Sequence, residues 1–137
     1  MTSPRAAHLL AGFMGLAGTA HFVVPRAYEQ LIPASFGSPK PWVYGSGVAE
    51  LACAGGLAVT ATRRPAAWAT AALLVGVFPG NVTMAVGSAG RGGAYRAVAY
   101  ARLPLQVPLV WWAVAVARGG RGTGRTASRP PPAVPSS

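Results

Sequence analysis

Four long apolar runs, separated by short stretches rich in Arg, Pro and Gly, dominate the hydropathy pattern of the chain. They extend over residues 6–24, 42–60, 66–86 and 97–117. A helix needs about 20 mostly apolar residues to cross the hydrocarbon core of a bilayer, and each run approaches that length. The pattern therefore predicts an all-α protein in which residues 1–117 form a bundle of four transmembrane helices.

Composition favours a membrane protein over a nucleic-acid-binding one. Of the 137 residues, 52% are hydrophobic and only 10% are charged. The net charge of +10 comes from Lys and Arg residues that are scattered between the apolar runs and do not cluster on one predicted face. Basic loops that flank apolar runs are typical of integral membrane proteins. The sequence thus indicates a multi-pass protein of the cell membrane, with the lipid bilayer as a partner and no nucleic acid.

The first run also has a reading as a cleaved signal peptide, because a basic residue precedes it and small residues follow at 18–20. The apolar stretch continues beyond these residues as far as Pro25, so a retained helix is the preferred interpretation. One face of this helix carries Ala11, Gly15 and Gly18. Small residues of this kind let membrane helices pack closely, because lipid supplies no hydrophobic force to join them.

The segments outside the runs predict interfacial and disordered structure. Residues 26–41 mix aromatic, apolar and charged side chains, which is typical of a short amphipathic turn in the headgroup zone. The aromatics Trp42 and Tyr44 are interpreted as interfacial anchors in preference to rings that stack on a ligand. The tail over 118–137 is rich in Arg, Pro, Gly and Ser, and this composition predicts a disordered basic segment.

Pro79 interrupts the third run. It has no N–H to donate to the carbonyl of Val75, so a kink or local unwinding is expected there. Asn81 follows directly, and its amide either serves the freed backbone and the bundle or contacts a ligand. The glycine-rich loop over 87–95 superficially resembles a phosphate-binding loop, but no strand precedes it and the Lys-Ser/Thr pair is missing.

The distribution of Lys and Arg predicts the orientation. With four spans, both termini lie on one side of the membrane. That side holds seven basic residues, namely Arg5, Arg63, Arg64, Arg118, Arg121, Arg125 and Arg129. The opposite side holds five, namely Arg26, Lys40, Arg91, Arg96 and Arg102. Because positive loops favour the cytoplasm, both termini are predicted to be cytoplasmic.

Five polar side chains fall at similar depth in the outer half of the four runs: His21, Glu50, Asn81, Arg102 and Gln106. Glu50 lies roughly 12 Å below the outer end of its run at 1.5 Å per residue. An ionisable group inside the bilayer costs about 2.5–3.5 kcal/mol on insertion scales unless it finds a partner or water. We therefore expect the five residues to form one buried polar cluster.

Two readings of this cluster remain open. As structural glue, Glu50 and Arg102 would form an ion pair and the other three residues would satisfy the remaining donors and acceptors. As a functional site, the cluster would be a pocket that binds a polar headgroup or carries protons. A metal site is weaker, since His21 with Glu50 offers only two good ligands. The single Cys53 excludes an intrachain disulfide.

The segments that carry these residues resemble the DoxX-like family of small membrane proteins. They read Gly18-Thr-Ala-His21-Phe-Val-Val-Pro25, Ser46-Gly-Val-Ala-Glu50-Leu, Phe78-Pro79-x-Asn81 and Arg102-Leu-Pro-Leu-Gln106. The resemblance covers about residues 10–117 and implies a four-helix membrane bundle whose polar positions are the five residues named above. One departure is Gly80, where alanine is more usual. The resemblance also implies a link to redox chemistry, because the family is named after a subunit of a quinone-linked oxidoreductase and relatives are associated with oxidative-stress partners.

Three classes of function follow. The first is a non-catalytic accessory subunit or anchor of a quinone- or oxidative-stress-linked membrane system, with a redox partner protein and a quinone contact. The second is a small-molecule or proton-coupled carrier that acts as a homo-oligomer, and the third is a membrane assembly or chaperone factor. One cysteine and no recognisable haem or flavin motif argue against a self-sufficient oxidoreductase. The first class is preferred, and the chain is not expected to be an enzyme by itself.

Overall fold

The computed structural model describes residues 3–119, and no strand occurs within them. The elements are α1 (Pro4–Val23), α2 (Pro25–Glu29), the 3-10 helix η1 (Ala34–Phe36), α3 (Pro39–Ala58), α4 (Arg63–Gly76), α5 (Phe78–Val86) and α6 (Gly93–Gly119). The prediction of an all-α protein is confirmed. The four apolar runs correspond to α1, α3, α4 with α5, and α6, within a few residues of the expected ends. Most of the predicted disordered tail, residues 120–137, lies outside the described residues.

Proline sets the start of several helices, because its missing N–H is not needed in the first turn and its φ is already helical. Pro4, Pro25, Pro39 and Pro79 occupy this position in α1, α2, α3 and α5. In α1 the Ser3 hydroxyl also accepts a hydrogen bond at 3.4 Å from the N–H three residues later. These local signals fix where the helices begin.

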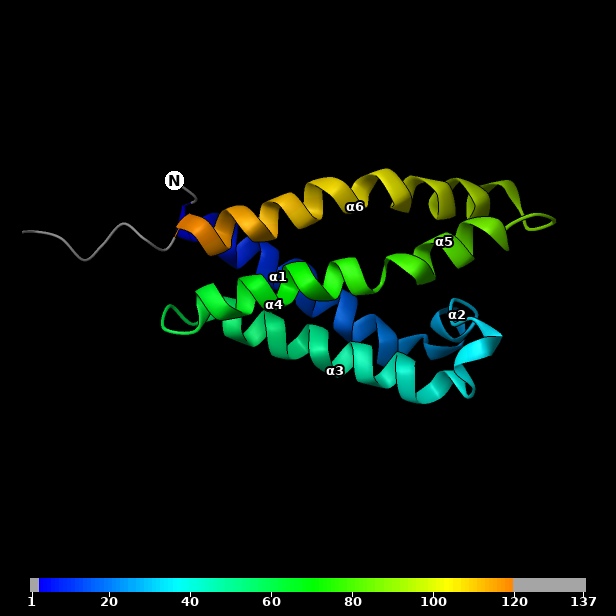
Figure 1. Ribbon diagram of the computed structural model, residues 1–137, viewed down its shortest axis with the longest axis horizontal. Helices are drawn as coiled ribbons and strands as arrows, with labels where there is room; N and C mark the ends of the chain where they lie inside the picture. Colours follow the sequence, from blue (N-terminus) through cyan, green and yellow to red (C-terminus); the bar gives the residue numbers. More distant parts are fainter. Residues whose placement is uncertain (1–2, 120–137) are drawn as a thin grey trace, which may run out of the picture.

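The third apolar run is interrupted at Val77, where α4 ends and α5 begins (Figure 1). Pro79 lies two residues later and cannot donate to the carbonyl of Val75. The local unwinding that the sequence predicts is therefore confirmed. The break lies four residues before the buried Asn81, so it opens the helix next to one of the predicted polar positions.

The helices form two pairs, α1 with α3 and α4–α5 with α6, and contacts between α3 and α4 join the pairs (Figure 1). The start of α1, the α3–α4 turn and the end of α6 lie at one end of the bundle. Small and aliphatic side chains fill that end, among them Leu10, Met14, Leu57, Ala67 and Val116. A smaller apolar cluster of Leu31, Met84 and Ala99 lies toward the other end. The predicted polar residues occupy the stretch between these two apolar clusters.

At Gly18 and Gly47, α1 and α3 approach so closely that neither helix has room for a side chain. A Cβ atom on Gly18 would lie 3.0 Å from the carbonyl oxygen of Gly47, and one on Gly47 would lie 3.2 Å from the carbonyl oxygen of Gly18. Ala11 is buried on the same face of α1, and Gly15 faces Ala54 of α3. The small-residue face predicted from the sequence is therefore the face on which α1 packs.

Two helical stretches among residues 3–119 are long and apolar enough to cross a membrane. They are Pro4–Val23, which is α1, and Arg63–Val86, which is α4 with α5. The other two predicted spans, α3 and α6, are of sufficient length but less apolar. Their hydropathy is lowered by polar side chains, including Glu50 in α3 and Arg102 with Gln106 in α6.

Candidate functional site

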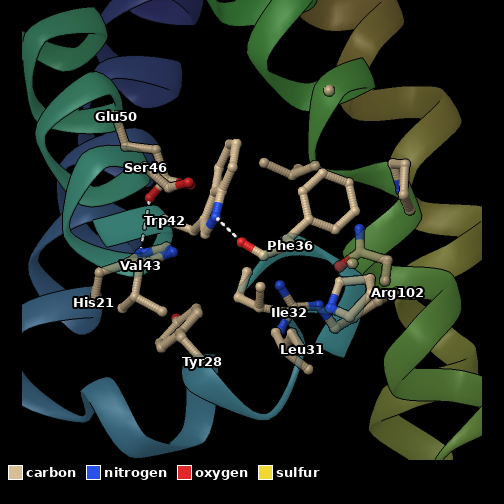
Figure 2. A pocket seen from close by; sticks show the side chains of 16 residues that line it. His21, Tyr28, Leu31, Ile32, Phe36, Trp42, Val43, Ser46, Glu50 and Arg102 are labelled. Atoms are coloured by element: carbon tan, nitrogen blue, oxygen red, sulfur yellow. Dashed lines mark hydrogen bonds and ion pairs between the residues drawn. The ribbon is translucent and has the colours of Figure 1, made fainter. Parts of the chain in front are cut away.

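A cavity of about 190 Å³ lies between the α1–α3 pair and the α5–α6 pair, and Figure 2 shows the side chains around it. Of the five polar residues expected to cluster, four line it, namely His21, Glu50, Asn81 and Arg102. The fifth, Gln106, is buried and contacts Asn81. The structure thus brings together side chains from four different helices.

His21 and Glu50 form the polar contact between α1 and α3. The His21 Nδ1 atom lies 3.2 Å from the Glu50 Oε2 atom. Each residue is only 8% exposed. The close approach at Gly18 and Gly47 explains the pairing, because His21 and Glu50 each lie three residues after one of these glycines and so share the same helix faces.

The Nδ1 atom of His21 has two hydrogen-bond acceptors nearby, the Glu50 carboxylate and a backbone carbonyl. His21 Nδ1 also lies 2.9 Å from the carbonyl oxygen of Ala17. Because both neighbours of this nitrogen are acceptors, Nδ1 is interpreted as the protonated nitrogen, and its N–H lies between the backbone carbonyl and the Glu50 carboxylate. The Glu50 Oε2 atom is buried against His21 in this ion pair without a well-aligned hydrogen bond, and Oε1 receives no hydrogen bond from any described residue. The carboxylate therefore has unused accepting capacity at the wall of the cavity.

The expected ion pair between Glu50 and Arg102 is wrong. Within residues 3–119 the Glu50 carboxylate pairs with His21 and not with Arg102. Arg102 is half-buried and lines the cavity from α6, whereas Glu50 lines it from α3 (Figure 2). The α1–α3 contact brings the histidine within reach of the carboxylate, and the cavity separates the carboxylate from the arginine.

Asn81 and Gln106 form a buried hydrogen-bonded chain between α5, α6 and α4. Asn81 Nδ2 donates to Gln106 Oε1 at 3.0 Å. Gln106 Nε2 in turn donates to the backbone carbonyl of Leu74, in the last turn of α4 before the break. Gln106, and not Asn81, therefore serves the interrupted backbone. The chain holds the broken helix against α6 and leaves Asn81 at the cavity wall.

Aromatic side chains form much of the remaining wall. The ring of Tyr28 stacks on the ring of His21, with centroids 3.8 Å apart. Trp42 Nε1 donates to the carbonyl of Phe36 at 3.1 Å, and the two rings meet edge to face at 5.3 Å. Tyr28, Phe36 and Trp42 all line the cavity. The segment expected to form only an interfacial turn thus folds as α2 and η1 and covers the site (Figure 2).

Sequence reasoning did not include these aromatic residues in the site. A signal for Trp42 exists, because Trp42, Ser46 and Glu50 are spaced by four residues and share one face of α3. All three line the cavity. Tyr28 and Phe36 lie in a segment without helical periodicity, so the sequence does not predict which way their side chains point.

Tyr28 is outside the predicted spans, and the pKa of its phenol depends on the charged residues around the cavity. Burial raises the pKa of its phenol above the ordinary value, the nearby Arg102 lowers it and Glu50 raises it. A tyrosine is already protonated at neutral pH, and the raised pKa extends the neutral form to more alkaline pH. Tyr28 is therefore a neutral group between the carboxylate and the guanidinium.

Comparison with known proteins gives one match. The model of a family described as a domain of unknown function (DUF8561) matches residues 10–117. This range runs from α1 to the end of the apolar core in α6 and includes every residue of the cavity. No curated protein and no solved structure matches the chain.

Proposed function

The chain belongs to the DUF8561 family, and we propose that it is a four-span membrane protein that binds a small ring compound of the quinone class as a non-catalytic accessory subunit of a membrane redox system. The cavity between the helix pairs carries the proposal.

The surface of the bundle supports a lipid environment. Large apolar side chains are exposed on every long helix, including Leu16 in α1, Val48 in α3, Val75 in α4 and Val107 with Trp111 in α6. Only 28% of the apolar stretch in α1 and 33% of that in α4–α5 is buried. A core helix of a soluble protein would be mostly buried, whereas a membrane helix presents apolar side chains to lipid.

The lower hydropathy of α3 and α6 is compatible with two further spans. The polar residues Glu50 and Gln106 are buried, and Arg102 lines the cavity. Polar side chains that face the interior of a bundle need not contact hydrocarbon. We therefore propose that α3 and α6 also cross the membrane, with their polar side chains turned away from lipid.

Orientation provides a direct prediction. The seven basic residues of the terminal side against five on the other favour cytoplasmic termini. Reporter fusions after Gly87 and after Gly119 are expected to report opposite sides of the membrane, with the second one cytoplasmic. The same location at both points would contradict four spans with both termini inside.

The cavity has the size and lining that a ring compound requires. An apolar cavity of about 150 Å³ is enough to hold benzene, and this one is about 190 Å³. The aromatic rings of Tyr28, Phe36 and Trp42 offer flat apolar walls. Arg102 supplies hydrogen-bond donors for the ring oxygens of a quinone. These residues bind and orient, and no catalytic role is assigned to any of them.

Purification of the full chain from membranes in a mild detergent tests this function. A redox protein and a quinone-class compound are expected to copurify with it. A homo-oligomer that retains neither would contradict the accessory role and favour a carrier instead. Another membrane protein without redox chemistry as the copurifying partner would also contradict it, and would favour an assembly factor.

A further inference from the structure

We propose that the cavity selects a ring compound with a hydrogen-bond donor at one end, which binds Glu50, and an acceptor at the other end, which binds Arg102. The inference rests on the proposed function only in taking the cavity as a ligand site. It goes further by naming the chemical polarity of the ligand, which is that of a para-substituted phenol.

The Glu50 end of the cavity lacks a donor. Its Oε2 atom is buried against His21, whereas its Oε1 atom receives no hydrogen bond from any residue that the structure describes, and Glu50 lines the cavity. The donor beside the carboxylate, His21 Nδ1, lies 3.2 Å from Oε2 and 2.9 Å from the carbonyl oxygen of Ala17, so it does not serve Oε1. A buried carboxylate oxygen without a donor is costly, and a ligand that brings a donor removes that cost. An ionised carboxylate accepts hydrogen bonds and cannot donate them.

The Arg102 end has the opposite chemistry. The guanidinium carries only donors, and Arg102 has no ion pair or hydrogen bond with any other residue of the part that the structure describes. Arg102 lines the cavity from α6, on the side away from α1 and α3 (Figure 2). A ligand that crosses the cavity must therefore present an acceptor to this side.

The space between the two ends fits a flat apolar body. Tyr28 lies against His21 on one side, and the edge-to-face pair of Phe36 and Trp42 lies on another. A ring that carries only acceptors at both ends, as an oxidised quinone does, would place lone pairs against the Glu50 carboxylate. A ring without polar groups would leave Glu50 Oε1 without a donor and Arg102 without an acceptor. Only a donor at one end with an acceptor at the other satisfies both. Within the quinone class the reduced quinol form meets this condition, because each of its hydroxyl groups can donate or accept.

Three ring compounds of nearly equal size separate these possibilities. 4-Methoxyphenol has the donor and the acceptor, 4-methylanisole replaces the hydroxyl by a methyl group, and 4-ethylphenol replaces the ether oxygen by a methylene. Their affinities would be measured by calorimetry on the full chain in detergent micelles. Val77→Phe, which fills the cavity wall, corrects for partition into micelles, and Val107→Phe on the exposed face of α6 is its matched control.

We expect the wild-type protein to bind 4-methoxyphenol about tenfold more tightly than either analogue, because a hydrogen bond to a charged group is lost in each case. In Glu50→Gln the preference over 4-methylanisole should fall to about threefold or less, while the preference over 4-ethylphenol persists. In Arg102→Met the reverse is expected. Each variant thus removes the discrimination at its own end only.

Equal affinity for all three compounds would overturn the inferred polarity of the ligand. The proposal that the cavity is a ligand site would still stand. Discrimination that survives in both Glu50→Gln and Arg102→Met would overturn the assignment of the two ends. If none of the compounds binds better to the wild type than to Val77→Phe, the proposed ligand site fails as well. Should a variant not fold, the three affinities of the wild-type protein decide the question alone.

Discussion

Replacement of Gly18 by alanine is expected to destabilise the bundle by about 1–3 kcal/mol, although glycine to alanine normally stabilises a helix. The added Cβ atom would lie 2.9 Å from Leu51 Cγ, 3.0 Å from the carbonyl oxygen of Gly47 and 3.1 Å from Glu50 Cβ. The backbone carbonyl cannot move away as a flexible side chain would. The two helices must therefore separate, and the contact between His21 and Glu50 lengthens with them.

Gly12→Ala is the matched control, because Gly12 lies in the same helix and a Cβ atom there would have nothing within 4 Å. We expect this variant to gain up to about 1 kcal/mol from helix propensity. Denaturation of both variants in the same detergent measures the two effects. Equal stability of Gly18→Ala and Gly12→Ala would show that α1 and α3 do not pack at Gly18.

Replacement of His21 or Glu50 by leucine should give the second large effect. His21→Leu leaves the carboxylate of Glu50 buried and unpaired, which costs about 3–5 kcal/mol in soluble proteins. The double variant replaces the pair by two apolar side chains of moderate size. It is expected to be less damaged than the sum of the single variants, with a coupling of about 1–3 kcal/mol.

The corresponding cycle for Glu50 and Arg102 distinguishes this account from the ion pair expected from sequence. The structure gives these residues no direct contact, so their effects on stability should add to within about 0.5 kcal/mol. Thermal unfolding in detergent serves both cycles. Coupling in the Glu50–Arg102 cycle with additivity in the His21–Glu50 cycle would show that the pairing derived from the structure is wrong.

The fold is largely accessible to sequence reasoning. The apolar runs locate every long helix, and Pro79 locates the break between α4 and α5, because the missing N–H acts within a single turn of the chain. The gathering of His21, Glu50, Asn81 and Arg102 at one cavity follows from their similar depth in the runs. Depth is a property of position along each helix, which hydropathy reports directly.

The pairing within the site depends on helix rotation, which hydropathy does not report. The spacing Gly18-x-x-His21 and Gly47-x-x-Glu50 would have favoured the histidine, because close helix approach at the glycines aligns the residues one turn later. The placement of Tyr28 and Phe36 is not accessible in this way. They lie in the connection over α2 and η1, whose path is set by contacts with other elements and not by its own periodicity.

Small molecules retained by the purified protein test the central claim, which is that the cavity between the helix pairs binds a ring compound in the membrane. Wild type, Val77→Phe and Val107→Phe would be extracted from membranes in parallel, and their bound compounds identified by mass spectrometry. Val77 lines the cavity and Val107 is exposed on α6. We predict a ring compound in the wild type and in Val107→Phe and its loss in Val77→Phe. Equal retention by all three proteins, or none in the wild type, would contradict the account.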